Sequence, residues 1–367
     1  METIGTFGGI LGNGPVLRLL ESTLERGEAA HAYLFYGQPG VGKRTAAYRF
    51  GAELVAGGDE GARDRALRGL HPDLYEVEPE GQFTTIGQIR AVVQGAASRP
   101  FEGARRVFML RADTLNVQAA NALLKTLEEP EGGAVFILLA SSREGVLPTV
   151  ASRAQAVRFD PVPRGEIVSL LMKRGHPEGK ASLAAALGRG SVGLALRYAE
   201  EDELKELREA IFGAGFAFDG SFEERHSAAE RIFARTEGVG AARERAYLEA
   251  YDADADGGLN RRAKESAKRL GRAARDGAVA EALELLALLY RDAAVVAAGA
   301  SELAVNVDRM SEIRARVAER SGADWAGAAG IFGEEGGKLT YNVSPEAILE
   351  VALSRSRQKI LESSRGS

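Results

Sequence analysis

A predicted strand, glycine-rich turn and helix start at Ala32–Thr45 constrain the fold of this chain more than any other stretch. The large, mostly apolar residues of Ala32–Tyr36 predict a buried strand, and the turn after it carries the spacing G-x-x-x-x-G-K. In such a loop, backbone N–H groups and a helix N-terminus face a phosphate, and the lysine reaches its outer oxygens. The sequence therefore predicts a phosphate-binding loop in an α/β domain. The candidate loop residues are Gly37, Gly40, Gly42, Lys43, Arg44 and Thr45.

The loop lacks the residue that normally holds Mg²⁺. A P-loop carries Ser or Thr after its lysine, and that hydroxyl binds the ion, but here Arg44 follows Lys43. Thr45 cannot simply substitute, because one further helical residue turns the side chain by about 100°. The loop is therefore present without its metal ligand.

The second buried strand, residues 106–110, lacks the acids that would complete a metal site. A P-loop ATPase needs an acidic residue at this strand's end to hold Mg²⁺ and to orient water. The expected positions hold Leu110 and Arg111, and we interpret the later Asp113 as a turn residue. Without metal the developing charge on the γ-phosphate is poorly neutralised, so hydrolysis is not expected. Lys43 either retains affinity for ATP phosphates without turnover or pairs with a carboxylate or sulfate.

Apolar strand patterns alternate with helical patterns up to about residue 160 and are absent after it. This alternation predicts a parallel sheet covered on both faces, followed by an all-helical region. The fold class is thus α/β plus all-α. The expected domains are residues 1–160, 161–212 and 213–367, with a charged insertion at about 213–278 and late helices at 302–320 and 344–361.

Composition narrows the function classes. The net charge of −5 over 367 residues provides no global basic field for nucleic acid. Cysteine is absent, which removes disulfides and cysteine-based zinc sites. No stretch approaches the roughly 20 apolar residues of a membrane span, and the first residues lack the pattern of a secretory leader. We expect a soluble, cytoplasmic protein without membrane contact.

Arg153 closes the α/β region and has two interpretations. It is either a salt-bridged surface residue or an arginine finger that acts in trans on the nucleotide of a neighbouring subunit. Sequence spacing alone does not choose between them.

Two charged segments in the C-terminal half also bear on function. Asp252, Asp254 and Asp256 resemble half of a calcium loop, but Ala263 stands where a bidentate glutamate is needed, so we expect only an acidic loop. A basic row on the next helix is usually a solvated face and could instead touch DNA phosphates. The row consists of Arg261, Lys264, Lys268, Arg272 and Arg275.

Five stretches together resemble the delta-prime family of bacterial DNA polymerase III clamp-loader subunits, which are degenerate AAA+ proteins. The segment Asn121–Pro130 is highly specific to clamp-loader subunits. The resemblance covers about residues 7–200, thins at 280–300 and 341–353, and is absent across roughly 213–278. The five stretches are residues 31–44, residues 71–74 with 86–90, residues 121–130, residues 147–153 and residues 341–345.

The resemblance implies an AAA+ P-loop domain, a small helical lid and a helical collar that holds the subunit in a ring-like pentamer. It implies a stator whose partners are the gamma/tau and delta subunits, and which supports ATP-driven loading of the sliding clamp on primed DNA. It identifies Arg153 as the trans-acting arginine and places Gly193 where ATPase relatives carry a sensor arginine. No cofactor is then required. Residues 56–70 replace the family's cysteine zinc module, so zinc is not expected.

Two other functions stay open. An active AAA+ ATPase of the gamma/tau type would use Lys43, Thr45 and Asp113 and would turn over ATP as an isolated chain. A P-loop small-molecule kinase is disfavoured by the long helical C-terminal half and by the lack of an acceptor-site signature.

Overall fold

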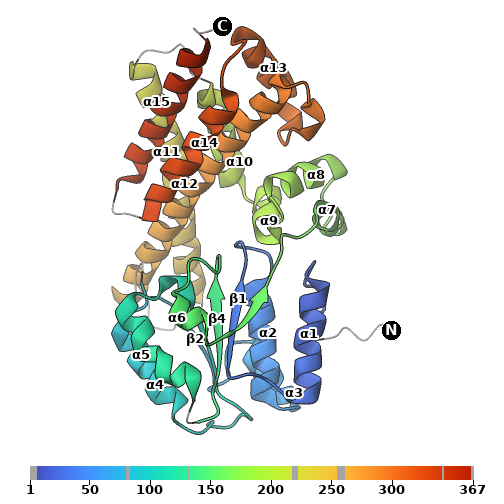
Figure 1. Cartoon of the computed structure of the whole chain (residues 1–367), viewed down its shortest axis with the longest axis vertical. Helices are drawn as coiled ribbons and strands as arrows, with labels where there is room; N and C mark the ends of the chain where they lie inside the picture. The colour runs from blue at the N-terminus through green and yellow to red at the C-terminus, as the bar shows by residue number, and fades with distance from the viewer. Residues whose placement is uncertain are drawn as a thin grey trace. The chain divides into compact units, whose positions relative to one another are not determined.

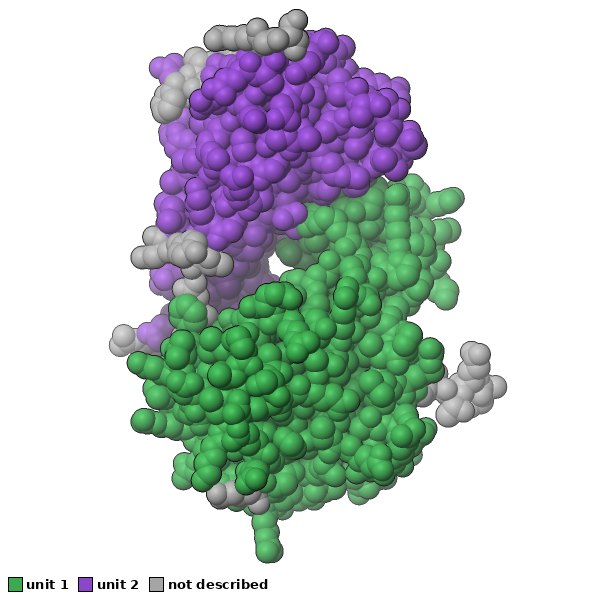
Figure 2. All heavy atoms as spheres, in the orientation of Figure 1, with its two compact units in different colours: residues 1–199 green, residues 200–367 purple. Residues whose placement is uncertain are grey.

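The fold is taken from a computed structural model, which describes residues 6–79, 83–130, 132–216, 222–253, 261–340 and 343–364. The chain divides into two units, residues 1–199 and residues 200–367 (Figure 2). The three-part division expected from the sequence stays a prediction.

A five-stranded parallel sheet organises the first unit, with strand order β2-β3-β4-β1-β5 (Figure 1). The inner strand β4 is buried throughout, because helices cover both faces of the sheet. The edge strand β5 buries only Val157. This arrangement confirms the expected α/β fold class. The strands are β1 (Ala32–Tyr36), β2 (Leu74–Val77), β3 (Val107–Arg111), β4 (Val135–Ala140) and β5 (Gln155–Arg158).

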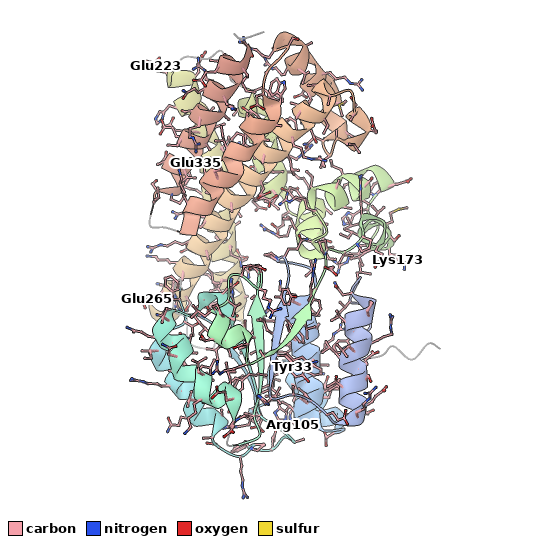
Figure 3. All side chains as sticks on the ribbon, viewed as in Figure 1. Tyr33, Arg105, Lys173, Glu223, Glu265 and Glu335 are labelled. Carbon is pink, nitrogen blue, oxygen red and sulfur yellow. The ribbon has the colours of Figure 1, made fainter. Side chains whose placement is uncertain are left out.

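Two apolar cores flank the sheet. On one face Tyr33 packs edge-on against Phe50 with ring centroids 5.1 Å apart (Figure 3). On the other face Phe108 stacks on Phe136 at 5.6 Å. These aromatic contacts fix the sheet between its helical layers. The helices of this part are α1 (Gly14–Arg26), α2 (Lys43–Ala56), α3 (Glu60–Leu67), α4 (Ile86–Ala96), α5 (Val117–Glu128) and α6 (Pro148–Ala151).

Three short helices follow the sheet: α7 (Arg164–Lys173), α8 (Glu178–Leu187) and α9 (Val192–Glu200). The turn before α9 is tied to the α/β part. The Gln38 side-chain amide donates to the Arg189 carbonyl at 2.8 Å, and the Val162 N–H donates to the Gly190 carbonyl at 2.9 Å. These bonds hold the start of α9 beside the phosphate loop.

The second unit is all-helical. The buried Tyr290 hydroxyl donates to the Gly215 carbonyl at 2.7 Å, and its ring packs against Trp325. Glu335, only 1% exposed, accepts from Lys338 and Arg355 (Figure 3). The buried carboxylate is thus paired with cations on two sides. The helices are α10 (Asp202–Gly215), α11 (Phe222–Ala253), α12 (Arg261–Ala297), α13 (Met310–Glu319), α14 (Trp325–Gly336) and α15 (Pro345–Ser364).

The charged region predicted at 213–278 contributes α11 and the first half of α12, which pack along one another (Figure 1). Asp254 and Asp256 of the expected acidic loop, and Tyr341 and Asn342 of the C-terminal signature, lie outside the described residues. Among the helices of the described ranges, none combines the length and the apolarity that crossing a membrane requires.

Candidate functional site

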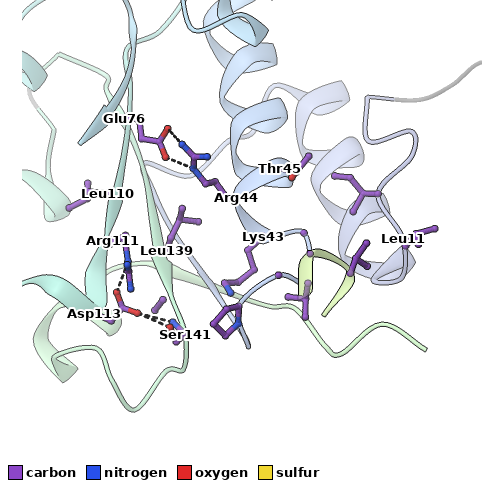
Figure 4. Close-up of a pocket in the computed structure, with 18 of the residues that line it drawn as sticks. Leu11, Lys43, Arg44, Thr45, Glu76, Leu110, Arg111, Asp113, Leu139 and Ser141 are labelled. Atoms are coloured by element: carbon purple, nitrogen blue, oxygen red, sulfur yellow. Dashed lines mark hydrogen bonds and ion pairs between the residues drawn. The ribbon is translucent and has the colours of Figure 1, made fainter. Parts of the chain in front are cut away.

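A cavity of about 640 Å³ opens over the phosphate loop (Figure 4). Its walls come from the loop and the start of α2, from the carboxyl ends of β2, β3 and β4, and from the first turn of α9. Ligands of open parallel sheets bind outside the carboxyl ends of the strands. The cavity therefore lies where a nucleotide-binding sheet would place its ligand.

Three glycines of the loop adopt positive φ, and two of them have no room for a side chain. A Cβ on Gly37 would lie 2.1 Å from the Phe159 carbonyl oxygen, and one on Gly40 would lie 1.9 Å from Ser191 Oγ. Gly42 has φ +96° immediately before α2. The loop is thus pressed against the end of β5 and the start of α9, which only glycine permits.

Lys43 is turned inward at the base of the cavity. Its ammonium donates to the carbonyl oxygens of Gly37 at 2.5 Å and Gln38 at 2.8 Å, and the residue is 9% exposed. Burial lowers the pKa of Lys43 to about 8, against an opposing effect of Asp113 and with a smaller lowering effect of Arg111. Among the described residues, no carboxylate lies within ion-pair distance of this ammonium.

Arg44 carries a guanidinium to the position where a P-loop holds its metal-binding hydroxyl. Its Nε and one terminal nitrogen each donate to a Glu76 carboxylate oxygen at 2.6 Å (Figure 4). These bonds raise the pKa of Arg44 above its ordinary value. Glu78 lies 3.7 Å away, and Thr45 is exposed. Such a bidentate pair fixes both groups.

Asp113 connects the ends of two strands. It lies in a short 3₁₀ turn and accepts from the Ser141 N–H at 3.0 Å and hydroxyl at 2.9 Å. Arg111 Nε donates to its other oxygen at 3.2 Å. Leu110, at the first position expected for an acid, is buried. Asp113 therefore lies in a turn, as we interpreted from the sequence.

The donor set around the loop does not fit a magnesium ion. Mg²⁺ takes near-octahedral oxygen ligands, usually one or two carboxylates together with waters and substrate phosphates. Here Glu76 is occupied by Arg44, and Asp113 is occupied by Arg111 and Ser141. The cavity contains cations of the protein at the positions where ATPases place the metal and its ligands.

Gly193 provides no sensor cation. It is the second residue of α9, and its N–H donates to the Gly40 carbonyl at 3.3 Å. A Cβ at this position would lie 3.7 Å from Gly40 Cα, an ordinary contact. The start of α9 therefore lies directly on the phosphate loop, and a small side chain at this position would also fit.

Arg153 lies outside the cavity lining, just after α6. Its Nε donates to Glu128 at 2.6 Å, a terminal nitrogen also contacts that carboxylate, and the other terminal nitrogen donates to the Thr149 carbonyl at 2.8 Å. The side chain is 30% exposed. The structure thus does not bring Arg153 to the phosphate loop of its own chain. Of the predicted loop residues, those that line the cavity are Gly40, Gly42, Lys43, Arg44 and Thr45.

Three residues of the site were missed from the sequence: Glu76, Glu128 and Ser191. Glu76 could have been found, because it is an acid near the carboxyl end of a predicted strand. Glu128 could also have been found, at the end of the predicted helix before Pro130. Ser191 had no such signal, because its contact with Gly40 joins two distant parts of the chain.

Comparisons with known proteins point to one family. The sequence profile described as "DNA polymerase III, delta subunit" matches residues 12–163. DNA polymerase III subunit delta' of Bacillus subtilis is 30% identical over 204 residues, which cover 53% of this chain and 62% of that protein. The Pseudomonas aeruginosa subunit delta' is 40% identical over 139 residues, covering 35% of this chain and 42% of that protein. The chain therefore spans less than two thirds of the length of these relatives.

Among solved structures, a DNA polymerase III gamma subunit-related protein of Thermotoga maritima aligns with a TM-score of 0.44 and 15% identity, over 93% of this chain and 99% of that one. The profile match falls within the unit that carries the phosphate loop. By sequence, this chain is similar to the delta' subunits of bacterial DNA polymerase III, and the similarity is carried by the unit with the phosphate loop.

Proposed function

We propose that this chain is a non-hydrolysing, delta-prime-like stator of a clamp loader, which supports ATP-driven loading of a sliding clamp on primed DNA. One observation carries the proposal. Arg44 and Arg111, at positions where an ATPase handles its metal, are paired with Glu76 and Asp113 of the same chain. Without a metal ion, the charge that develops on a transferring phosphoryl group would be poorly neutralised in this pocket.

The active residue of the proposed stator is Arg153, offered in trans to the ATP of an adjacent gamma/tau subunit. A finger needs a guanidinium held in place at a subunit edge. Glu128 and the Thr149 carbonyl hold this one, and the side chain remains 30% exposed. The delta subunit, the clamp and DNA would then be partners through the assembly.

The reconstituted loader tests this role. An arginine finger contributes about 10³–10⁵ to phosphoryl transfer at the site that it serves. We expect Arg153→Ala to leave assembly intact and to depress ATP hydrolysis measured with clamp and primed DNA present. Arg158→Ala is the matched control, since Arg158 is a nearby arginine that pairs with Asp160 at 2.8 Å. Hydrolysis at the wild-type rate by the Arg153→Ala loader would refute the trans role.

The second candidate is an active ATPase of the gamma/tau type. It is favoured by similarity to a gamma subunit of Buchnera aphidicola, at 26% identity, and to the tau subunit of Bacillus subtilis, at 28% identity. This candidate requires Mg²⁺-dependent turnover by the isolated chain, which the occupied carboxylates of the pocket disfavour.

A further inference from the structure

The basic row of α12 lies in the part of the chain that the family profile does not match. Lys264, Lys268 and Arg272 recur every four residues, so they follow one flank of the helix at intervals of about 6 Å. Arg269 adds a cation beside them, and Arg275 extends the row by almost one turn. Glu265, which is labelled in Figure 3, directly follows Lys264 in the sequence.

The row is available to a ligand. Lys264, Lys268 and Arg272 are exposed, and no ion pair is found for them among the described residues. Arg275 is half-buried and pairs with Asp276 at 2.8 Å, and Arg269 donates to Ser266 at 3.1 Å. Three adjacent cations without counterions of their own keep their full charge for an external anion.

The adjoining flank of α12, one residue before each cation and about 100° around the helix, packs against α11. Ala263 and Ala267 are buried, and a Cβ on Gly271 would lie 3.0 Å from the Gly240 carbonyl oxygen of α11. Small residues thus let α11 and α12 approach closely along this length. The row is displayed on a packed pair of long helices rather than on a single exposed one.

We propose that this row binds the phosphate backbone of double-stranded DNA directly. A row of exposed cations along one helix flank is the kind of charge cluster with which proteins contact the DNA backbone. Single-strand binding uses aromatic side chains on which bases stack, and residues 261–278 contain none. The choice of DNA over another duplex rests on the proposed function. This chain would then bind DNA by itself, in addition to any contact with DNA that the other subunits of the assembly make.

Salt dependence of binding to a 25-base-pair duplex tests the proposal on the isolated full chain. Each phosphate contact contributes about −0.9 to the slope of log K against log salt concentration. We expect the variant K264Q/K268Q/R272Q to lose about 2.7 of the wild-type slope and to bind more weakly at low salt. The same protein should bind a 25-nucleotide single strand less tightly than the duplex.

The control is the variant K173Q/K180Q/R314Q, which removes the same charge from three exposed residues on other helices. It should keep the wild-type slope. Equal losses in both variants, no duplex binding by the wild type, or tighter binding of the single strand would each overturn the proposal. Because the assay contains no ATP and no other subunit, its failure would leave the proposed role of Arg153 untouched.

Discussion

At the scale of single residues, the titration of Lys43 in the phosphate loop makes the free energy of unfolding depend on pH. Burial lowers its pKa from 10.5 to about 8, so folding disfavours its charged form. At pH values between these two pKa values, Lys43 is protonated more often in the unfolded chain than in the folded chain. The contribution of Lys43 to the free energy of unfolding is therefore lowest below pH 8 and rises as the pH increases towards 10.5.

We expect this effect to appear as a pH-dependent difference between the wild type and Lys43→Met. From pH 7 to pH 9.5 the free energy of unfolding of the wild type should rise by about 2 kcal/mol relative to the variant. Urea denaturation at both pH values measures this change. The exposed Lys180, replaced by methionine, is the matched control for loss of an amine. A difference that stays constant with pH would contradict the buried titration.

At the scale of elements, Gly240 of α11 and Gly271 of α12 determine how closely these two long helices of the second unit approach each other. A Cβ on Gly240 of α11 would lie 2.7 Å from the Gly271 carbonyl oxygen of α12, which is backbone and cannot rotate away. Gly238 lies on the same helix, and a Cβ there would meet nothing within 4 Å. Alanine at Gly240 therefore tests the packing between the helices, whereas alanine at Gly238 tests helix propensity alone.

Gly240→Ala should lower the free energy of unfolding by about 1–3 kcal/mol, the usual cost of overpacking. Gly238→Ala should raise it by roughly 0.5–1 kcal/mol, because alanine is the better helix former. Urea or thermal denaturation of the two variants measures both effects. Equal stability of the two variants would show that the helices do not approach closely at Gly240.

Elements could be predicted from the sequence where their signals are local. Thr85 accepts from the Gln88 N–H and Asn116 accepts from the Ala119 N–H, and both helix starts follow from these caps. The edge strand β5 was missed because it buries a single residue, Val157. Helix α14 was missed because its glycines are poor helix formers. Its burial of Trp325 and other apolar residues outweighs that propensity.

For the candidate site too, the residues with a local sequence signal could be predicted and the contacts between distant residues could not. The loop from Gly37 to Thr45 is contiguous, so its spacing identified it and its missing metal ligand. The partners of its residues come from elsewhere in the chain. Glu76 reaches Arg44 from β2, and Ser191 reaches Gly40 from the start of α9. Such pairings are set by the sheet and by the turn before α9, which the sequence pattern alone does not place.

At the scale of the whole molecule, the residues that depart from the sequence pattern of a P-loop ATPase come from three separate parts of the first unit. Arg44 begins α2, Arg111 ends β3, and Gly193 lies in α9. All three line the same cavity. Since metal binding, water orientation and charge neutralisation are separate requirements of phosphoryl transfer, repair of one leaves the others unmet.

We therefore expect the isolated chain to show no Mg²⁺-dependent release of phosphate from ATP, and Arg44→Thr not to create it. The substitution would free Glu76 and restore a hydroxyl, but Leu110 and Arg111 would still stand at the positions of the acids. Phosphate release at saturating ATP, with and without Mg²⁺, measures this. Lys43→Ala is the control, because it removes the loop cation that any ATPase of this type needs. Turnover by the wild type that Lys43→Ala abolishes would favour the gamma/tau-like alternative. Turnover gained by Arg44→Thr alone would show that one residue had silenced the site.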